Sequence, residues 1–387
     1  MNSEQQKEIV NELLENKKKY LYKKDAIDKL LSDKNPNKDD LRYIITHLVL
    51  DENIFFWMDF ISENLDKIAC DKQNFINIIK NLIIKIKSDM AQGKFVNALI
   101  SIGSKNPDLG FKIYNKLVDR PKDTSVYHYA CLLLGGIGRS KFNEVKNYIQ
   151  LRLSTELSDN QFVKAGFITA CRVIIESDQE FKNKSFYYKI VDFANKPNNS
   201  EIIRIQGALL AFDINKFDRE KSLEFIRKFI TDKPSENLLS AISERIWVWG
   251  LDNKSDDFEI IELIVKYDND RVYSHICYFL AKNNSYSKSK SFDILIRMLE
   301  SDKSTANADF HYAIEEMGKT DFNFYKKKMI EYVNKCDKSN VLFDLSYLLH
   351  DFTKNLEASE EEVKKLIKII NSRTKLLYEK YDREKLV

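Results

Sequence analysis

The sequence predicts an all-α fold in which about eight helix pairs stack into an α-α superhelix behind an N-terminal helical cap. Three observations lead to this prediction. Small residues recur about every 35 positions, apolar residues follow helical spacing, and the five prolines all fall between the expected helices. Ten glycines and five prolines are also too few for an all-β chain with many tight turns.

The recurring small residues form one column of the repeat. Its members are Ala98, Ala130, Gly166, Gly207, Ala241, Ile276, Ala313 and Ser346. Successive members lie 32, 36, 41, 34, 35, 37 and 33 residues apart, and seven of the eight are Ala, Gly or Ser. Small side chains let one helix backbone lie close to the next, and this kind of self-similarity is typical of helical solenoids.

Between these small residues the apolar positions predict pairs of helices. In 219–231, for example, Leu223, Ile226, Phe229 and Ile230 share one helical face. The expected pairs are 125–140 with 142–155, 160–177 with 184–196, 200–217 with 219–231, 235–250 with 257–267, 270–282 with 287–301, 306–318 with 323–335, and 339–354 with 360–381.

The chain shows no low-complexity linker, so we expect one continuous solenoid over residues 94–387. Residues 1–93 are helical in pattern but do not share the register of the repeat. Terminal units of solenoids differ from inner ones because they expose an outer face. We therefore predict that 1–93 form an N-terminal helical cap.

Composition favours a cytoplasmic protein. The five cysteines are odd in number, widely separated and without a CxxC pair, as expected for buried, reduced thiols. The polar N-terminus is unlike a signal peptide, and the most apolar stretch, 129–138, is about half the length of a membrane span. The net charge of +3 arises from 62 basic and 59 acidic residues, which is weak support for a polyanionic partner.

One segment resembles a known repeat family. Residues 133–139, with Val145 and Ile149 in the next helix, resemble the helix–turn–helix pattern of HEAT repeats, and 100–103 and 316–319 are similar to the same turn. In this frame the glycine cluster at 135–138 is expected to be an interhelical turn. The resemblance covers about 94–381, although most units lack the family's proline, Asp and Arg positions. It implies a superhelical fold, and HEAT-like proteins serve as scaffolds, transport receptors, regulatory subunits and sometimes enzymes.

No pattern in the sequence predicts catalysis. A GxSxG elbow, a phosphate-binding glycine loop and an HExxH pair are all missing. His128 and His311 occupy the same repeat column, but five repeat steps place them roughly 40–50 Å apart, too far to bind one metal ion. We expect no catalytic residue, no cofactor and no metal site, and hence a protein that is not an enzyme.

The best candidate for a partner contact is the group Arg245, Trp247 and Trp249. On a helix the two tryptophans point about 200° apart, so at most one joins the core between repeats. An outward tryptophan beside an arginine suits the anchoring of a peptide or stacking on a base. The alternative is that both tryptophans simply pack within the protein.

Two lysine-rich stretches are candidates for phosphate contacts. They contain Lys17, Lys18, Lys19, Lys23 and Lys24 near the N-terminus, and Lys326, Lys327 and Lys328 in a predicted second helix. Each lysine that neutralises a phosphate adds salt-dependent affinity for nucleic acid. Acidic residues flank both stretches, however, so the alternative is an ordinary solvated helix face.

These features favour a non-catalytic scaffold or binding module that holds a protein or peptide partner on the solenoid surface. The alternative is a nucleic-acid-binding HEAT-like solenoid, in the manner of the HEAT-like DNA glycosylases. That alternative requires Lys and Arg on the second helices of the pairs, with an exposed carboxylate among aromatic residues.

Overall fold

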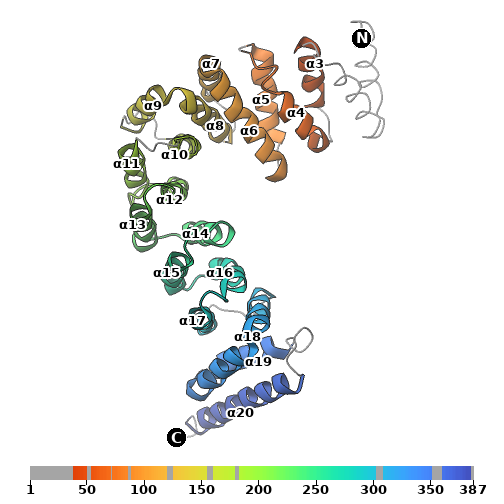
Figure 1. Cartoon of the computed structure of the whole chain (residues 1–387), viewed down its shortest axis with the longest axis vertical. Coiled ribbons are helices and arrows are strands. Elements are labelled where there is room, and N and C mark those ends of the chain that lie inside the picture. The colour runs from red at the N-terminus through yellow and green to blue at the C-terminus, as the bar shows by residue number, and fades with distance from the viewer. Residues whose placement is uncertain are drawn as a thin grey trace. The chain divides into compact units, whose positions relative to one another are not determined.

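The computed structural model describes residues 38–49, 54–70, 72–85, 89–119, 125–154, 160–178, 183–301, 308–350 and 360–384 (Figure 1). Within these ranges every regular element is a helix, which confirms the all-α prediction. The chain divides into two compact units, which we call unit 1 (1–193) and unit 2 (194–387).

Unit 1 contains helices from α3 to α11. Their bounds are α3 (Lys38–Leu48), η1 (Ile54–Trp57), α4 (Met58–Asn64), α5 (Gln73–Lys85), α6 (Asp89–Lys105), α7 (Pro107–Val118), α8 (Ser125–Ser140), α9 (Phe142–Ser154), α10 (Gln161–Ile175) and α11 (Lys184–Ala194). The first helices of successive pairs pack on one another, α6 on α8 and α8 on α10.

Unit 2 continues the same plan. Its elements are α12 (Glu201–Ile214), α13 (Arg219–Thr231), α14 (Glu236–Val248), α15 (Lys254–Ile264), η2 (Val265–Tyr267), α16 (Asp270–Asn283), α17 (Lys288–Leu299), α18 (Ala308–Lys335), α19 (Ser339–His350) and α20 (Glu360–Glu384). Helices α12, α14, α16 and α18 pack in series, and α13 packs on α15 beside them, to the left in Figure 1. Stacked pairs of this kind are the building plan of a helical solenoid.

Counted from α6, the described helices form eight pairs, because α18 contains two members of one pair. At Asp321 the backbone leaves the helical region, with φ −165° and ψ 83°. The Asp321 carboxylate accepts a hydrogen bond from the Phe324 N–H at 3.1 Å and so caps the second half of α18. The sequence predicted separate helices on either side of this point.

Most of the small-residue column lies buried where helices approach one another. A Cβ added to Gly166 of α10 would lie 2.7 Å from the Sγ of Cys131 and 3.3 Å from the Tyr127 carbonyl oxygen, both on α8. No larger residue fits there without moving α10 away from α8. Ile276, the exception in the column, is itself fully buried.

The glycine cluster at 135–138 is not a turn, and that prediction is wrong. Gly135, Gly136 and Gly138 are buried inside α8, which continues to Ser140. A Cβ on Gly136 would collide with the Ile100 carbonyl of α6, and a Cβ on Gly103 would collide with the Leu133 carbonyl of α8. The glycines therefore permit two helix backbones to touch, and the connection between α8 and α9 falls at Lys141 instead.

The division between the two units falls at the end of α11. The predicted boundary at residues 93 and 94 lies within α6, and the proposal of a separate N-terminal cap stays a prediction.

All five cysteines lie in the described part of the chain and none forms a disulfide. Four of them are buried, and burial raises the pKa of the Cys131 and Cys171 thiols, so both stay protonated.

Candidate partner-binding surface

The two tryptophans of the predicted contact group occupy different environments at the end of α14. Trp249 is the first residue after the helix, and its side chain is 67% exposed. Trp247 is half-buried and stacks on His275 of α16, with ring centroids 6.0 Å apart and planes inclined by 10°. One tryptophan thus packs on the next repeat while the other faces outward, as the spacing predicted.

Arg245 lies between aromatic rings and is largely shielded from solvent. Its guanidinium carbon is 4.5 Å from the centroid of the Trp249 ring and 5.7 Å from that of Phe212 on α12. One guanidinium nitrogen, Nη2, lies 3.8 Å from Oδ1 of Asp213. Arg245 therefore ties α14 to α12 and holds Trp249, and offers little surface of its own.

The ring contacts of Trp247 continue onto two further helices, α16 and α18. Tyr278 of α16 lies 5.0 Å from Trp247 and 5.5 Å from Tyr312 of α18, measured between ring centroids. A separate ring contact joins α18 to α19, where the ring centroids of His311 and Tyr347 are 5.5 Å apart. We call this surface the aromatic face and define it as Trp247, His275, Tyr278, His311, Tyr312, Phe343 and Tyr347.

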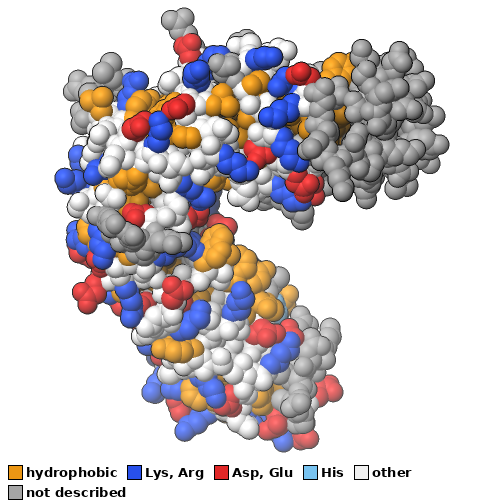
Figure 2. Space-filling view, turned by 45° about the horizontal axis from the view of Figure 1, so that its top comes forward, with side chains coloured by type: hydrophobic (Ala, Val, Ile, Leu, Met, Phe, Trp, Pro, Cys, Tyr) orange, Lys and Arg blue, Asp and Glu red, His pale blue; other side chains and the backbone are white. Residues whose placement is uncertain are grey.

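The outer part of the aromatic face is open to solvent. Tyr312 is 41% exposed, Phe343 is 60% exposed and Tyr347 is 58% exposed. Phe343 and Tyr347 are four residues apart, which places them on one side of α19. Figure 2 shows hydrophobic side chains gathered along one edge of unit 2, with charged side chains beside them. Large exposed aromatic groups in a continuous surface are a feature of interaction sites.

Helix geometry explains why the sequence alone did not reveal this face. Tyr312 and Tyr347 each stand next to a small-residue column member, Ala313 and Ser346, which are buried. A residue beside a buried position on a helix is turned about 100° toward the surface. The sequence therefore contains a sign of the aromatic face, an aromatic residue next to a member of the small-residue column. Only the stacking of helices brings these aromatic residues together.

Hydrogen bonds fix the inner part of the face. The Ser243 hydroxyl donates to the Ser240 carbonyl at 2.9 Å, and its oxygen lies 3.1 Å from Nδ1 of His275. One helical turn after His275 on α16, hydrogen bonding to Asp309 raises the pKa of Tyr278. Both groups are thereby held in one orientation.

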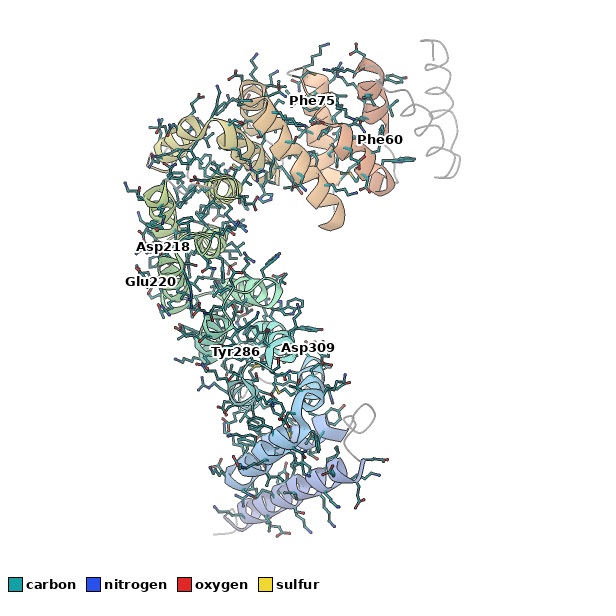
Figure 3. The ribbon with its side chains drawn as sticks, viewed as in Figure 1. Phe60, Phe75, Asp218, Glu220, Tyr286 and Asp309 are labelled. Atoms are coloured by element: carbon teal, nitrogen blue, oxygen red, sulfur yellow. The ribbon has the colours of Figure 1, made fainter. Side chains whose placement is uncertain are left out.

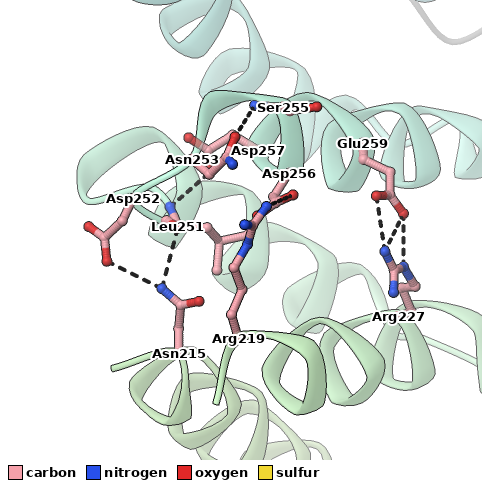
Figure 4. A network of polar contacts seen from close by, with 10 residues as sticks. All are labelled: Asn215, Arg219, Arg227, Leu251, Asp252, Asn253, Ser255, Asp256, Asp257 and Glu259. Atoms are coloured by element: carbon pink, nitrogen blue, oxygen red, sulfur yellow. Dashed lines mark hydrogen bonds and ion pairs between the residues drawn. The ribbon is translucent and has the colours of Figure 1, made fainter. Parts of the chain in front are cut away.

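The second helices of the pairs in unit 2 are α13, α15, α17, the second half of α18 and α20, and we call them the second-helix row. This row carries ion pairs between neighbouring repeats. Arg219 of α13 binds Asp256 of α15 through two hydrogen bonds of 2.6 and 2.7 Å, and Arg227 binds Glu259 through two of 2.8 and 3.0 Å (Figure 4). Three further pairs join successive helices along this row: Lys290 with Glu262 at 3.2 Å, Lys288 with Asp321 at 2.6 Å and Lys326 with Glu362 at 2.8 Å. These cations are neutralised by carboxylates of the protein itself.

Two of the three described lysines that were predicted to contact phosphate are also paired with carboxylates. Lys326 pairs with Glu362, and Lys328 lies 3.7 Å from Glu331 of its own helix. Lys327 is exposed. The N-terminal lysines Lys17, Lys18, Lys19, Lys23 and Lys24 lie outside the described residues.

A shallow groove of about 660 Å³ lies between the end of α18 and α20. It is lined by Asn334, Lys365, Lys368, Ile369, Ser372, Arg373 and Leu376. Across the described ranges, no three or more His, Cys, Asp or Glu side chains are grouped so as to hold a metal ion. No helix in these ranges is long and apolar enough to cross a membrane.

Comparison of the sequence with protein-family models and with curated proteins finds no match.

Proposed function

We propose that this chain is a HEAT-like helical repeat protein of the cytoplasm that binds a partner protein through the aromatic face of unit 2 and has no catalytic activity of its own. The observation that carries the proposal is the unbroken run of ring contacts from Trp247 to Tyr312, flanked by the exposed rings of Phe343 and Tyr347. Tyrosine and tryptophan are enriched among the residues that dominate binding energy in protein interfaces.

The size of the face suits a protein partner. An aromatic side chain buries about 150–250 Å² when fully covered, so each half-exposed ring has roughly 100 Å² left to bury. At about 25 cal/mol per Å², that is about 2.5 kcal/mol for each of the rings of Tyr312, Phe343 and Tyr347 before the costs of association. A few such anchors are enough to drive specific binding.

Charge distribution supports a protein partner over a nucleic acid. Four cations of the second-helix row, Arg219, Arg227, Lys290 and Lys326, form ion pairs with carboxylates from adjacent repeats. Nucleic-acid binders instead present clustered cations to the phosphate backbone. The pairing of these four cations with carboxylates therefore counts against the nucleic-acid alternative on this row.

The test is an affinity pull-down from native lysate, with and without nuclease, using the full chain and a Tyr312→Ala/Tyr347→Ala variant. We expect a protein that survives nuclease with the parent chain and is lost with the variant, because the variant removes two exposed anchors. Both proteins should keep the same melting temperature. Recovery only of nuclease-sensitive material, or equal recovery with the variant, contradicts the proposal.

Tyr286→Ala is the matched control for this experiment. Tyr286 is 56% exposed, close to the exposure of Tyr347, but it lies between α16 and α17 and stacks on Phe258 of α15. Figure 3 shows Tyr286 beside the second-helix row, whereas Asp309 lies at the start of α18. Retained binding in this control excludes a general effect of removing a surface tyrosine.

A further inference from the structure

We infer that the partner segment bound by the aromatic face presents arginine or lysine side chains. The inference rests on the proposed function and specifies the chemistry of the partner. It follows from the charges that surround the rings on all four helices of the face.

Carboxylates predominate around the aromatic face. Residues three or four positions away on a helix are surface neighbours. By this rule Glu244 neighbours Trp247, Glu316 neighbours Tyr312 and Asp344 neighbours Tyr347. We count the described charged residues that neighbour a ring of the face or form an ion pair with such a neighbour. The acidic ones are Glu236, Glu244, Asp309, Glu315, Glu316 and Asp344. The basic ones are Arg271, Lys282 and Lys319. Six carboxylates against three cations leave the face negative.

Two of these three cations are already engaged. Lys319 lies 2.7 Å from a Glu315 oxygen and 2.9 Å from a Glu316 oxygen, so it neutralises part of that acidic pair. Arg271 donates to Asn237 at 2.5 Å and lies 4.0 Å from Glu236. Neither reaches the carboxylates at the two ends of the face, Glu244 and Asp344.

Asp344 lies between Phe343 and Tyr347 in sequence and is partly buried. Burial raises the pKa of its carboxyl group, so an approaching cation stabilises the ionised form. The same cation would lie close to exposed aromatic rings, whose electron-rich faces attract positive charge. Carboxylates and aromatic rings together therefore favour a cationic side chain over an apolar or acidic one.

The protein already contains an arginine in this kind of environment. Arg245 is held by the rings of Trp249 and Phe212 and by the carboxylate of Asp213. The planar guanidinium suits such sites because it stacks on rings while it bonds to carboxylates. On the aromatic face the rings and carboxylates are present, and we expect the partner to supply the guanidinium or ammonium group.

The experiment selects peptides from a random 12-residue display library on the full chain. Peptides that lose binding to the Tyr312→Ala/Tyr347→Ala variant should be enriched in Arg and Lys relative to the input library. Synthetic copies, titrated by isothermal calorimetry, should bind about tenfold more weakly to that variant. They should bind about three- to tenfold more weakly to Glu244→Gln/Asp344→Asn.

The matched control is Glu220→Gln/Asp293→Asn, which removes the same charge from exposed positions on α13 and α17. It should leave affinity unchanged. If the face-dependent peptides lack cations, or if Glu244→Gln/Asp344→Asn binds as well as the parent, the cationic inference is wrong while the binding function stands. If no selected peptide depends on Tyr312 and Tyr347, both are wrong.

Discussion

Trp247 and His275 stack with their ring planes only 10° apart, although they belong to different helix pairs. His275 is in turn held by Ser243, which lies one turn before Trp247 on α14. The pair therefore has a structural role, joining α14 to α16, and it also begins the aromatic face that continues to α19.

The two tryptophans should respond differently to truncation. Trp247→Ala removes a ring packed on His275 and Tyr278, and we expect the free energy of unfolding to fall by about 2–3 kcal/mol. Trp249→Ala removes a ring that is 67% exposed and should cost less than about 1 kcal/mol. Urea denaturation of both variants measures the difference. Equal losses would show that Trp249 is part of the core.

Alanine at the contact of α6 with α8 should be strongly destabilising. Gly136→Ala places a methyl group against the Ile100 carbonyl of α6. Because this neighbour is backbone, it can move away only if α6 and α8 separate. We expect a loss of about 2–4 kcal/mol in thermal or chemical unfolding.

Gly93→Ala is the control for this prediction. Gly93 lies in α6, the other helix of this contact, with no atom within 4 Å of the added Cβ, and alanine should stabilise the helix by up to about 1 kcal/mol. Similar losses in the two variants would contradict the close approach of the backbones.

Asp257 should make unit 2 less stable as pH rises. Its side chain is fully buried, accepts the Leu251 N–H at 2.7 Å and lies 3.3 Å from Nζ of Lys254, and burial raises its pKa above the usual value. A raised folded-state pKa means that the contribution to stability is complete below the unfolded pKa of about 3.9 and is lost as pH rises through the folded value.

Asp257→Asn keeps an oxygen acceptor for Leu251 but cannot ionise. We therefore expect the variant to gain stability over the parent between about pH 4 and pH 7, as measured by urea unfolding at each pH. Asp252→Asn, a substitution at an exposed position, serves as the control. If the stability of the parent and that of Asp257→Asn changed with pH in parallel, Asp257 would not be the group responsible for the pH dependence.

The ion pairs of the second-helix row should contribute different amounts to the free energy of unfolding, according to how deeply each pair is buried. Arg227 and Glu259 are each more than 40% exposed, so Arg227→Ala should cost no more than about 1 kcal/mol, and less in high salt. Arg219→Ala should be the more damaging change, because it leaves the buried Asp256 carboxylate without its guanidinium. Denaturation at low and high salt compares the two, and a larger effect for Arg227 would contradict this ranking.

The local sequence determined the helices because their signals act over a few residues. Apolar spacing predicted the helix pairs, including separate helices on either side of the break within α18, where the structure shows Asp321 capping the second half. The glycine cluster of α8 was misassigned because a glycine that permits close packing and a glycine that makes a turn are identical in one dimension.

Only the tertiary structure decided which distant residues meet. Trp247, Tyr278, Tyr312 and Tyr347 come from four helices, and no local pattern links them. Arg227 and Glu259 are 32 residues apart and pair only because α13 packs on α15. The spacing of the two tryptophans predicted that they point in different directions, but stacking of α14 on α16 determined that Trp247 is the one that packs. Side-chain contacts between repeats depend on the rotation and offset of one helix against the next, which the repeat period alone does not specify.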